Sequence, residues 1–129
     1  MTIVEQIVKR EIEAVIIFEN DEVIAFLDHD PINRGHVLIC PTKPFHDFID
    51  VPDNVMNEIL VVARDIYLKM AGKYSPDGIS FIQNNGSCNE LDHYHLHIFP
   101  RFKNDGFGWL SSEIGLQNKK QLEIEAVGL

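Results

Sequence analysis

Histidine alternates with apolar residues in one short stretch, HYHLHIF, at positions 93–99. Side chains on a β-strand point alternately to its two faces, so this pattern predicts a strand with three imidazoles on one face. Tyr94, Leu96 and Ile98 would lie on the other face, which needs a covering layer. The stretch therefore predicts a sheet whose apolar side packs on a helix and whose histidine side is free to form a functional site.

The rest of the chain contains the other elements that such a sheet needs. Apolar residues at helical spacing predict one long helix over residues 51–73 and a short one over 3–10. The histidine stretch belongs to an expected strand over 92–102 that stops near Pro100. Four more strands are expected, the first two as a hairpin: 14–19, 22–28, 36–40 and 78–83. These elements predict an α+β fold on a mostly antiparallel sheet.

Length and composition indicate a single domain, which we expect to span residues 1–129. The apolar fraction of 45% and the charged fraction of 24% are ordinary for a globular protein. No apolar stretch is long enough to span a bilayer, and the charged N-terminus is not that of a secretion signal. Cys40 and Cys88 are far apart and form no CxxC pair. We therefore expect a cytoplasmic protein with reduced thiols and no membrane partner.

The charge balance limits the partners that the chain can have. Acidic residues outnumber basic ones by 20 to 11, which gives a net charge of −9. Proteins that coat nucleic acid need a basic face to replace counterions, so we expect no nucleic-acid partner. A small phosphorylated ligand remains compatible with this charge, because a few local donors can hold one phosphate.

Three interpretations of the alternating histidines are open at this point. They can be chance surface residues, which three imidazoles in phase on an apolar strand make harder to accept. They can be metal ligands, since two histidines on one strand face can both reach one ion. A metal site would need further ligands, and the candidates are not in an obvious ligand-spacing motif: His29, His36, His46, Cys88 and Glu90.

The third interpretation is nucleophilic catalysis. Much of a histidine population is neutral near pH 7, because the unperturbed pKa is about 6.5. A neutral imidazole nitrogen can attack phosphorus and carry the transferred group covalently. A neighbouring imidazole can donate to a phosphate oxygen or to the leaving group. His95, which has a histidine on each side, is the natural nucleophile.

The sequence resembles the histidine triad (HIT) superfamily, whose signature is His-apolar-His-apolar-His-apolar-apolar. Upstream, AVIIFENDEVIAFLDHDPINRGHVLICP resembles the first half of that family: a hairpin, an AFLD strand, then Gly-His and an apolar strand that ends in proline. NNG, at 84–86, matches the family's Asn-x-Gly loop, and FPR, at 99–101, is a common ending. The similarity covers about residues 14–102.

This resemblance implies a fold, an assembly and a chemistry. The family fold is an α+β domain with a five-stranded antiparallel sheet, usually paired as a homodimer. The family binds nucleotides, and its members hydrolyse or transfer nucleoside monophosphates from phosphoramidates, dinucleoside polyphosphates and related compounds. By resemblance, His95 attacks the α-phosphorus, His93 orients His95, and His97 contacts the phosphate and assists the leaving group. The implied ligand is a purine nucleotide or a related small molecule.

The resemblance also implies residues that bind the nucleotide. Asp28 matches the carboxylate that holds the ribose hydroxyls, although an aspartate there can also cap the following loop. His29 and Phe26 fall where the family lines its base pocket, and an aromatic residue in a strand can equally be core. Asn84 matches a polar residue beside the phosphate, or it is a turn residue before Gly86.

The loop before the triad departs from the family pattern. Relatives often have Gly-Gln-(Ser/Thr)-Val there, and this chain has Cys88-Asn89-Glu90-Leu91. Asn89 is a candidate donor to the phosphate. Glu90 replaces a hydroxyl donor by a carboxylate, which would repel an anionic ligand unless it turns away, is protonated or recognises a different leaving group.

A second departure concerns metal. Many bacterial relatives hold a structural zinc with an N-terminal CxxC and a histidine near the end of the third strand. In this chain Thr2 and Glu5 occupy the N-terminal positions, Pro44 occupies the histidine position, and His46 is shifted. A closed zinc site needs thiolates or an equivalent donor set, so we expect no structural metal and no cofactor.

Three functions therefore compete. The first is an enzyme that transfers or hydrolyses nucleotides through His95. The second is a nucleotide-binding or interaction module with little catalysis, which Glu90 and the altered loop favour. The third is a metal protein that uses the triad as ligands. Trp109 lies in a C-terminal stretch that varies in the family, and we assign it to a dimer interface.

Overall fold

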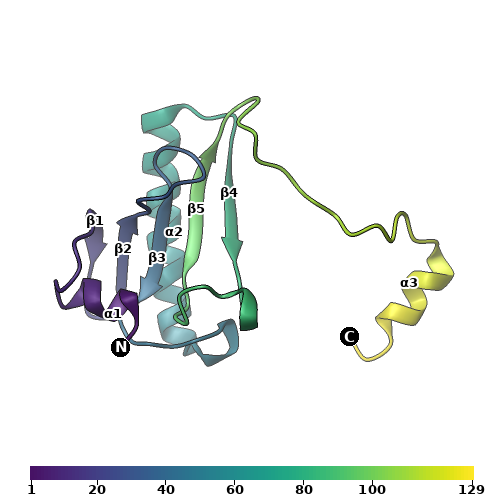
Figure 1. Cartoon of the computed structure of the whole chain (residues 1–129), viewed down its shortest axis with the longest axis horizontal. Helices are drawn as coiled ribbons and strands as arrows, with labels where there is room; N and C mark the ends of the chain where they lie inside the picture. The colour runs from purple at the N-terminus through teal and green to yellow at the C-terminus, as the bar shows by residue number, and fades with distance from the viewer.

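The computed structural model describes all 129 residues and has one five-stranded sheet in the order β1-β2-β3-β5-β4 (Figure 1). Every neighbouring pair of strands is antiparallel. The strands are β1 (Ile16–Glu19), β2 (Val23–Leu27), β3 (Val37–Pro41), β4 (Gly78–Gln83) and β5 (Leu96–Arg101). The predicted α+β fold with a five-stranded antiparallel sheet is confirmed.

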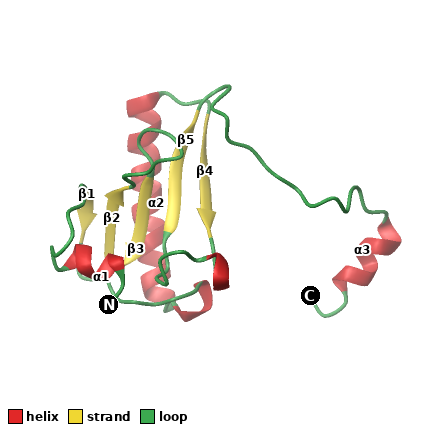
Figure 2. Cartoon of the chain, viewed as in Figure 1, coloured by secondary structure: helices red, strands yellow, loops and turns green.

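Three α-helices accompany the sheet, and Figure 2 shows the long one running along it. They are α1 (Ile3–Val8), α2 (Asp53–Tyr74) and α3 (Lys119–Ala126). Two short 3₁₀ turns lie in the connections: η1 (Phe48–Asp50) before α2 and η2 (Gly86–Cys88) after β4. The expected long and short helices therefore form, and a third helix, α3, lies near the C-terminus.

The two faces of the sheet have separate cores. One face packs on α2, and Tyr94, Leu96 and Ile98 belong to that core, as the alternation predicts. The opposite face packs on α1 through Val4 and Ile7 in a smaller core. Because α1 has only six residues, it covers only part of the second face. The remainder of this face is where a site can form.

The last strand differs from its prediction at both ends. It begins at Leu96 rather than at residue 92, so His93 and His95 precede it. If the β3–β5 register continued, Tyr94 would lie opposite Pro41, which has no N–H to donate. The Pro41 carbonyl oxygen accepts from His93 Nε2, and the Tyr94 N–H donates instead to Phe45 O. Pro100 does not stop the strand, because β3 pairs with β5 only as far as Ile98 and requires no donor beyond it.

The C-terminal segment extends away from the sheet. Residues after β5 run out to α3, which stands apart from the other elements (Figure 1). None of the residues of α3 is buried, and Trp109 in the connecting segment is 99% exposed. The assignment of residues 1–129 to one domain therefore stays a prediction.

Candidate active site

A cavity of about 1060 Å³ opens on the sheet face that α1 only partly covers. This volume is slightly above the usual range for small-molecule sites, which is roughly 300–1,000 Å³. Two histidines of the triad, His95 and His97, line the cavity. It also brings together five further residues singled out in the sequence: Phe26, Asp28, His29, His36 and Glu90.

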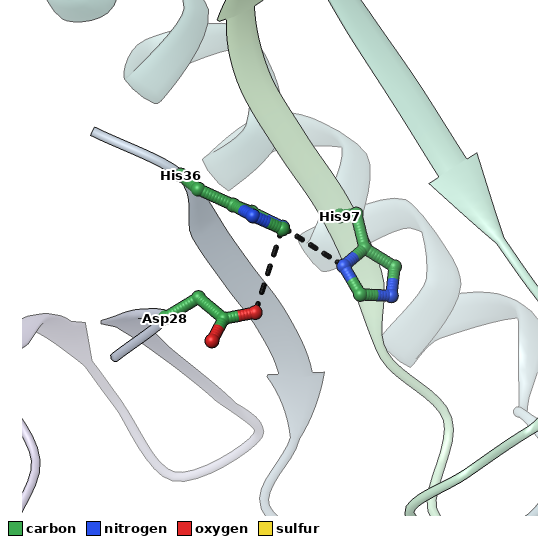
Figure 3. A group of neighbouring side chains, drawn as sticks. All are labelled: Asp28, His36 and His97. Atoms are coloured by element: carbon green, nitrogen blue, oxygen red, sulfur yellow. Dashed lines mark hydrogen bonds and ion pairs between the residues drawn. The ribbon is translucent and has the colours of Figure 1, made fainter. Parts of the chain in front are cut away.

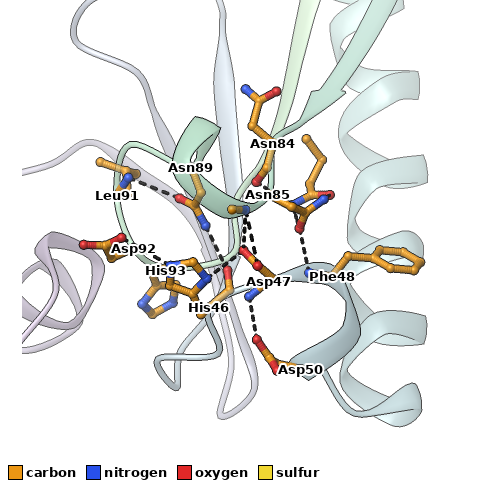
Figure 4. A network of polar contacts seen from close by, with 12 residues as sticks. His46, Asp47, Phe48, Asp50, Asn84, Asn85, Asn89, Leu91, Asp92 and His93 are labelled. Atoms are coloured by element: carbon orange, nitrogen blue, oxygen red, sulfur yellow. Dashed lines mark hydrogen bonds and ion pairs between the residues drawn. The ribbon is translucent and has the colours of Figure 1, made fainter.

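Asn84 and Asn89, the two predicted amide contacts, do not line this cavity. Asn89 is buried, its Nδ2 donates to His46 O at 2.8 Å, and its Oδ1 accepts from the Leu91 N–H at 3.2 Å. Figure 4 shows Asn89 in a polar network that ties the loop after β4 to the segment before α2. In the structure, Asn89 therefore stabilises the loop before the triad, and Asn84 does not line the cavity.

His95 has a lone pair directed to solvent. Its Nδ1 lies 2.8 Å from His93 O, and a carbonyl oxygen can only accept, so Nδ1 carries the proton. In the neutral ring Nε2 is then unprotonated. Nε2 has no hydrogen-bond partner in the chain, and no buried side-chain nitrogen or oxygen lacks one, so this atom reaches solvent in the cavity. This arrangement suits a nucleophile.

His97 has the opposite tautomer, which His36 sets. The Ile32 N–H donates to His36 Nδ1 at 3.0 Å, so the proton of a neutral His36 is on Nε2. That nitrogen lies 2.9 Å from His97 Nδ1 and donates to it (Figure 3). His97 Nδ1 is therefore an acceptor, and its Nε2 carries a proton that it can donate into the cavity.

Burial keeps this pair of imidazoles neutral. Burial lowers the pKa of His97 to about 4, and the nearby His95 and His36 add to the effect. Burial also lowers the pKa of His36, against the opposing effect of the Asp28 carboxylate. Asp28 Oδ2 lies 3.8 Å from His36 Nε2, which is too long for a strong hydrogen bond. Both rings are therefore neutral near pH 7, as the hydrogen bond between them requires.

His93, in contrast, is not on an open face. The expectation that all three histidines face a free side is wrong for His93, which has no exposed surface. Its Nε2 lies 2.7 Å from Pro41 O, and its Nδ1 lies 2.9 Å from Thr2 Oγ1. The physical reason is the early end of the β3–β5 pairing, which turns His93 back against β3 and the start of α1. Burial lowers the pKa of His93.

His36 is the functional residue whose role the sequence did not reveal. It was a candidate metal ligand and part of the Gly-His motif, but its contact with His97 spans 61 residues. The strand register indicates this contact, because Leu38 pairs with His97 and His36 lies two residues before Leu38 on the same face of the sheet. Gly35 before it has a φ of +85°, and a Cβ there would lie 2.5 Å from the Tyr74 ring.

Two groups of side chains have the donor types of a metal site. The potential ligand atoms of Asp28, His36 and His97 all lie within 4.8 Å of one another, as do those of His46, Asp47 and Asp50. In the first group the two imidazoles already share a proton across 2.9 Å, so a cation would have to displace it. The expectation of no metal stays a prediction.

Comparison with known proteins identifies the family. The model of the HIT domain family matches residues 9–104, so this chain belongs to the HIT family. An uncharacterized HIT-like protein from Methanocaldococcus jannaschii is 37% identical over 109 residues, which cover 82% of this chain and 83% of that protein. A Candida albicans protein named adenosine 5′-monophosphoramidase is 32% identical over 114 residues, or 81% of this chain and 74% of the relative.

Solved structures of HIT proteins have the same fold. The crystal structure of a HIT family member from Bacillus subtilis has a TM-score of 0.85 at 25% identity, and the match covers 98% of this chain and 92% of that one. The histidine triad nucleotide-binding protein from Candida albicans has a TM-score of 0.77 at 28% identity, with 97% and 92% covered. Within this chain, no helix has the length and apolar character needed to cross a membrane.

The buried histidines should make stability depend on pH. An unfolded histidine binds its proton near pH 6.5, whereas folded His97 binds it only near pH 4, so the unfolded state holds more protons in between. The free energy of unfolding should therefore fall as pH decreases from about 6.5 to 4. In urea titrations at several pH values, His97→Gln should have a flatter profile than wild type. His29→Gln, at an exposed position, is the control, and equal slopes for wild type and His97→Gln would contradict the assignment.

Proposed function

We propose that this protein is a nucleotide hydrolase or transferase that acts on a nucleoside 5′-monophosphate linked to an amine, a phosphate or a second nucleotide. The observation that carries the proposal is the complementary pair of nitrogens in one cavity. His95 Nε2 has a lone pair there, and His97 Nε2 has a proton to donate. The relative named adenosine 5′-monophosphoramidase and the nucleotide-binding structural neighbour support this reaction class.

The proposed reaction has two steps. In the first, His95 Nε2 forms a bond to the α-phosphorus, and the bond to the leaving group breaks with its electron pair. The leaving group takes a proton from solvent. In the second, water attacks phosphorus and loses a proton to solvent, the N–P bond breaks with its electron pair returning to His95 Nε2, and the nucleoside monophosphate leaves. His97 stays neutral near pH 7, so we assign its Nε2–H to hydrogen bonding with the phosphate and leaving group.

We further propose that the other cavity residues hold the nucleotide. Asp28 Oδ1 accepts from the Asp30 N–H at 2.9 Å, so this residue does cap its loop. Its second oxygen, Oδ2, makes no hydrogen bond in the chain and is available to ribose hydroxyls. Phe26, which is largely buried, and His29, which is exposed, are assigned to the base. A purine base and a cytoplasmic location both stay predictions.

The covalent intermediate can be tested directly. Intact-protein mass spectrometry after brief exposure to adenosine 5′-phosphoramidate, quenched without acid, should show a transient adduct of one nucleoside monophosphate. His95→Ala should form no adduct and lose at least about 10³-fold in turnover, because the nucleophile is gone. His46→Ala, outside the cavity, is the matched control. Turnover of His95→Ala at the wild-type rate would overturn the proposal.

Glu90 should set the response to the charge of the leaving group. Its carboxylate lines the cavity and is exposed, and no hydrogen bond or ion pair neutralises it. We expect Glu90→Gln to increase kcat/KM for a dinucleoside polyphosphate by about threefold to tenfold, because one like-charge repulsion is removed. The value for an uncharged amine leaving group should change little. Glu125→Gln, in the exposed α3, is the control. Equal changes for both substrates would contradict this role.

Glu90 also supports a second candidate function, a nucleotide-binding module with little catalysis. A carboxylate beside the phosphate opposes the accumulation of negative charge that phosphoryl transfer requires. This alternative predicts measurable binding of a nucleoside monophosphate without turnover of any phosphoramidate or dinucleotide. Calorimetric titration and the turnover assay, run on the same sample, distinguish the two functions.

We propose that the protein forms a homodimer through α2 and β4. Strand β4 is an edge of the sheet, and its Phe81 ring stacks on Tyr67 with the centroids 6.4 Å apart. Several large apolar side chains on the two elements are exposed: Leu60, Val61, Tyr67, Leu68 and Phe81. Exposed large apolar side chains gathered on neighbouring elements are typical of an interface. The role of Trp109 in that interface stays a prediction.

The dimer predicts a solution mass of twice 14.8 kDa by light scattering. Leu68→Lys should lower the mass toward that of one chain, because it places a charge in the apolar surface. Val127→Lys, at an exposed position of the C-terminal segment, should leave the dimer intact. A wild-type protein that is monomeric at micromolar concentration would refute the interface.

A further inference from the structure

The first residues of the chain contact the buried histidine of the triad. Thr2 Oγ1 lies 2.9 Å from His93 Nδ1, although the two residues are 91 positions apart. His93 Nε2 faces Pro41 O at 2.7 Å and must donate to it, because a carbonyl oxygen only accepts. In the neutral ring Nδ1 is therefore an acceptor, and the Thr2 hydroxyl is the donor.

Helix α1 fixes the direction of that hydroxyl. Thr2 is the N-cap of α1, and its Oγ1 accepts from the Glu5 N–H at 3.1 Å. In return, the Thr2 N–H donates to Glu5 Oε2 at 2.7 Å, which completes a capping box. With its acceptor side used by Glu5, the hydroxyl has its proton free for His93. The capping box therefore holds the donor in place.

The contact continues to the proposed nucleophile. His93 O accepts from His95 Nδ1 at 2.8 Å, and this hydrogen bond leaves His95 Nε2 unprotonated. A shift of His93 would move the carbonyl oxygen that orients His95. Glu5 and His95 are the charged or titratable side chains that act on His93, and Glu5 favours its cation.

We propose that Thr2 is a positioning residue of the active site: its hydroxyl holds His93 in the neutral Nε2–H form and, through His93 O, orients His95. This inference rests on the proposed function, in which His95 is the nucleophile. Thr2 would otherwise be only a helix cap, which predicts an effect on stability and none on the chemistry of His93. The two roles can be separated because a cap needs an acceptor, whereas His93 needs a donor.

Thr2→Asp separates them. Aspartate is a good N-cap, so α1 keeps its acceptor, but a carboxylate has no proton to donate to His93 Nδ1. With Pro41 O on one side and a carboxylate on the other, both ring nitrogens must carry protons, so the pKa of His93 should rise. Thr2→Ser keeps both the cap and the donor and is the matched control.

The experiment measures pH–rate profiles with adenosine 5′-phosphoramidate and the ring ¹⁵N chemical shifts of His93. Thr2→Asp should lower kcat at pH 7 by about tenfold to 100-fold, by analogy with the loss of a hydrogen bond that orients a metal-ligating histidine. Its acid limb should move to higher pH, and its His93 shifts should be those of the doubly protonated ring. Thr2→Ser should stay within about threefold of wild type with an unchanged profile.

Two outcomes would overturn the inference. One is a Thr2→Asp variant with the wild-type profile and a neutral His93. The other is a loss of activity in Thr2→Asp that follows entirely from a lower unfolding midpoint, with no change in the pH dependence of the rate. If the wild-type protein forms neither adduct nor product, the proposed function fails, and the ¹⁵N shifts still report whether Thr2 controls the protonation of His93.

Discussion

Two backbone carbonyl oxygens determine where the protons of the first two triad histidines lie. Pro41 O accepts from His93 Nε2, and His93 O accepts from His95 Nδ1. A carbonyl oxygen cannot donate, so each contact fixes the tautomer of a neutral imidazole without a charged partner. Pro41 has two separate effects: it has no N–H with which to continue the pairing with β5, and its carbonyl oxygen accepts from the His93 side chain. The lone pair of His95 Nε2 is available because His95 Nδ1 donates to His93 O.

The unequal covering of the sheet explains why the cavity lies where it does. The helix α2 spans 22 residues and packs along one face, so the side chains there form a continuous core. The helix α1 spans six residues and covers only part of the other face. The uncovered part borders three strands: Asp28 directly follows β2, His36 directly precedes β3, and His97 is the second residue of β5.

Local patterns predicted the elements well and the contacts between distant residues poorly. Strand β4 has the expected limits, 78–83, and the alternation identified which residues of β5 face α2. The same alternation failed at His93, because the φ of +52° at Asp92 and the missing N–H of Pro41 end the strand early. Asp28 and His29, which the resemblance implies as nucleotide-binding residues, line one cavity, and their roles stay predictions. The contacts of His36 and Thr2 span 61 and 91 residues, and no local pattern contains such information.

Burial keeps the hydrogen-bonded imidazoles of His36 and His97 neutral in this site. If a second proton entered the His36–His97 pair, one of the two facing nitrogens would lose its lone pair as acceptor, and the 2.9 Å contact would place two N–H groups against each other. A fully solvated histidine would be partly protonated near pH 6.5. The low pKa of His97 follows mainly from burial, so the same packing that stabilises the sheet also keeps its Nε2 proton directed into the cavity. A substitution that admits water behind His97 should therefore disturb the site before it disturbs the fold.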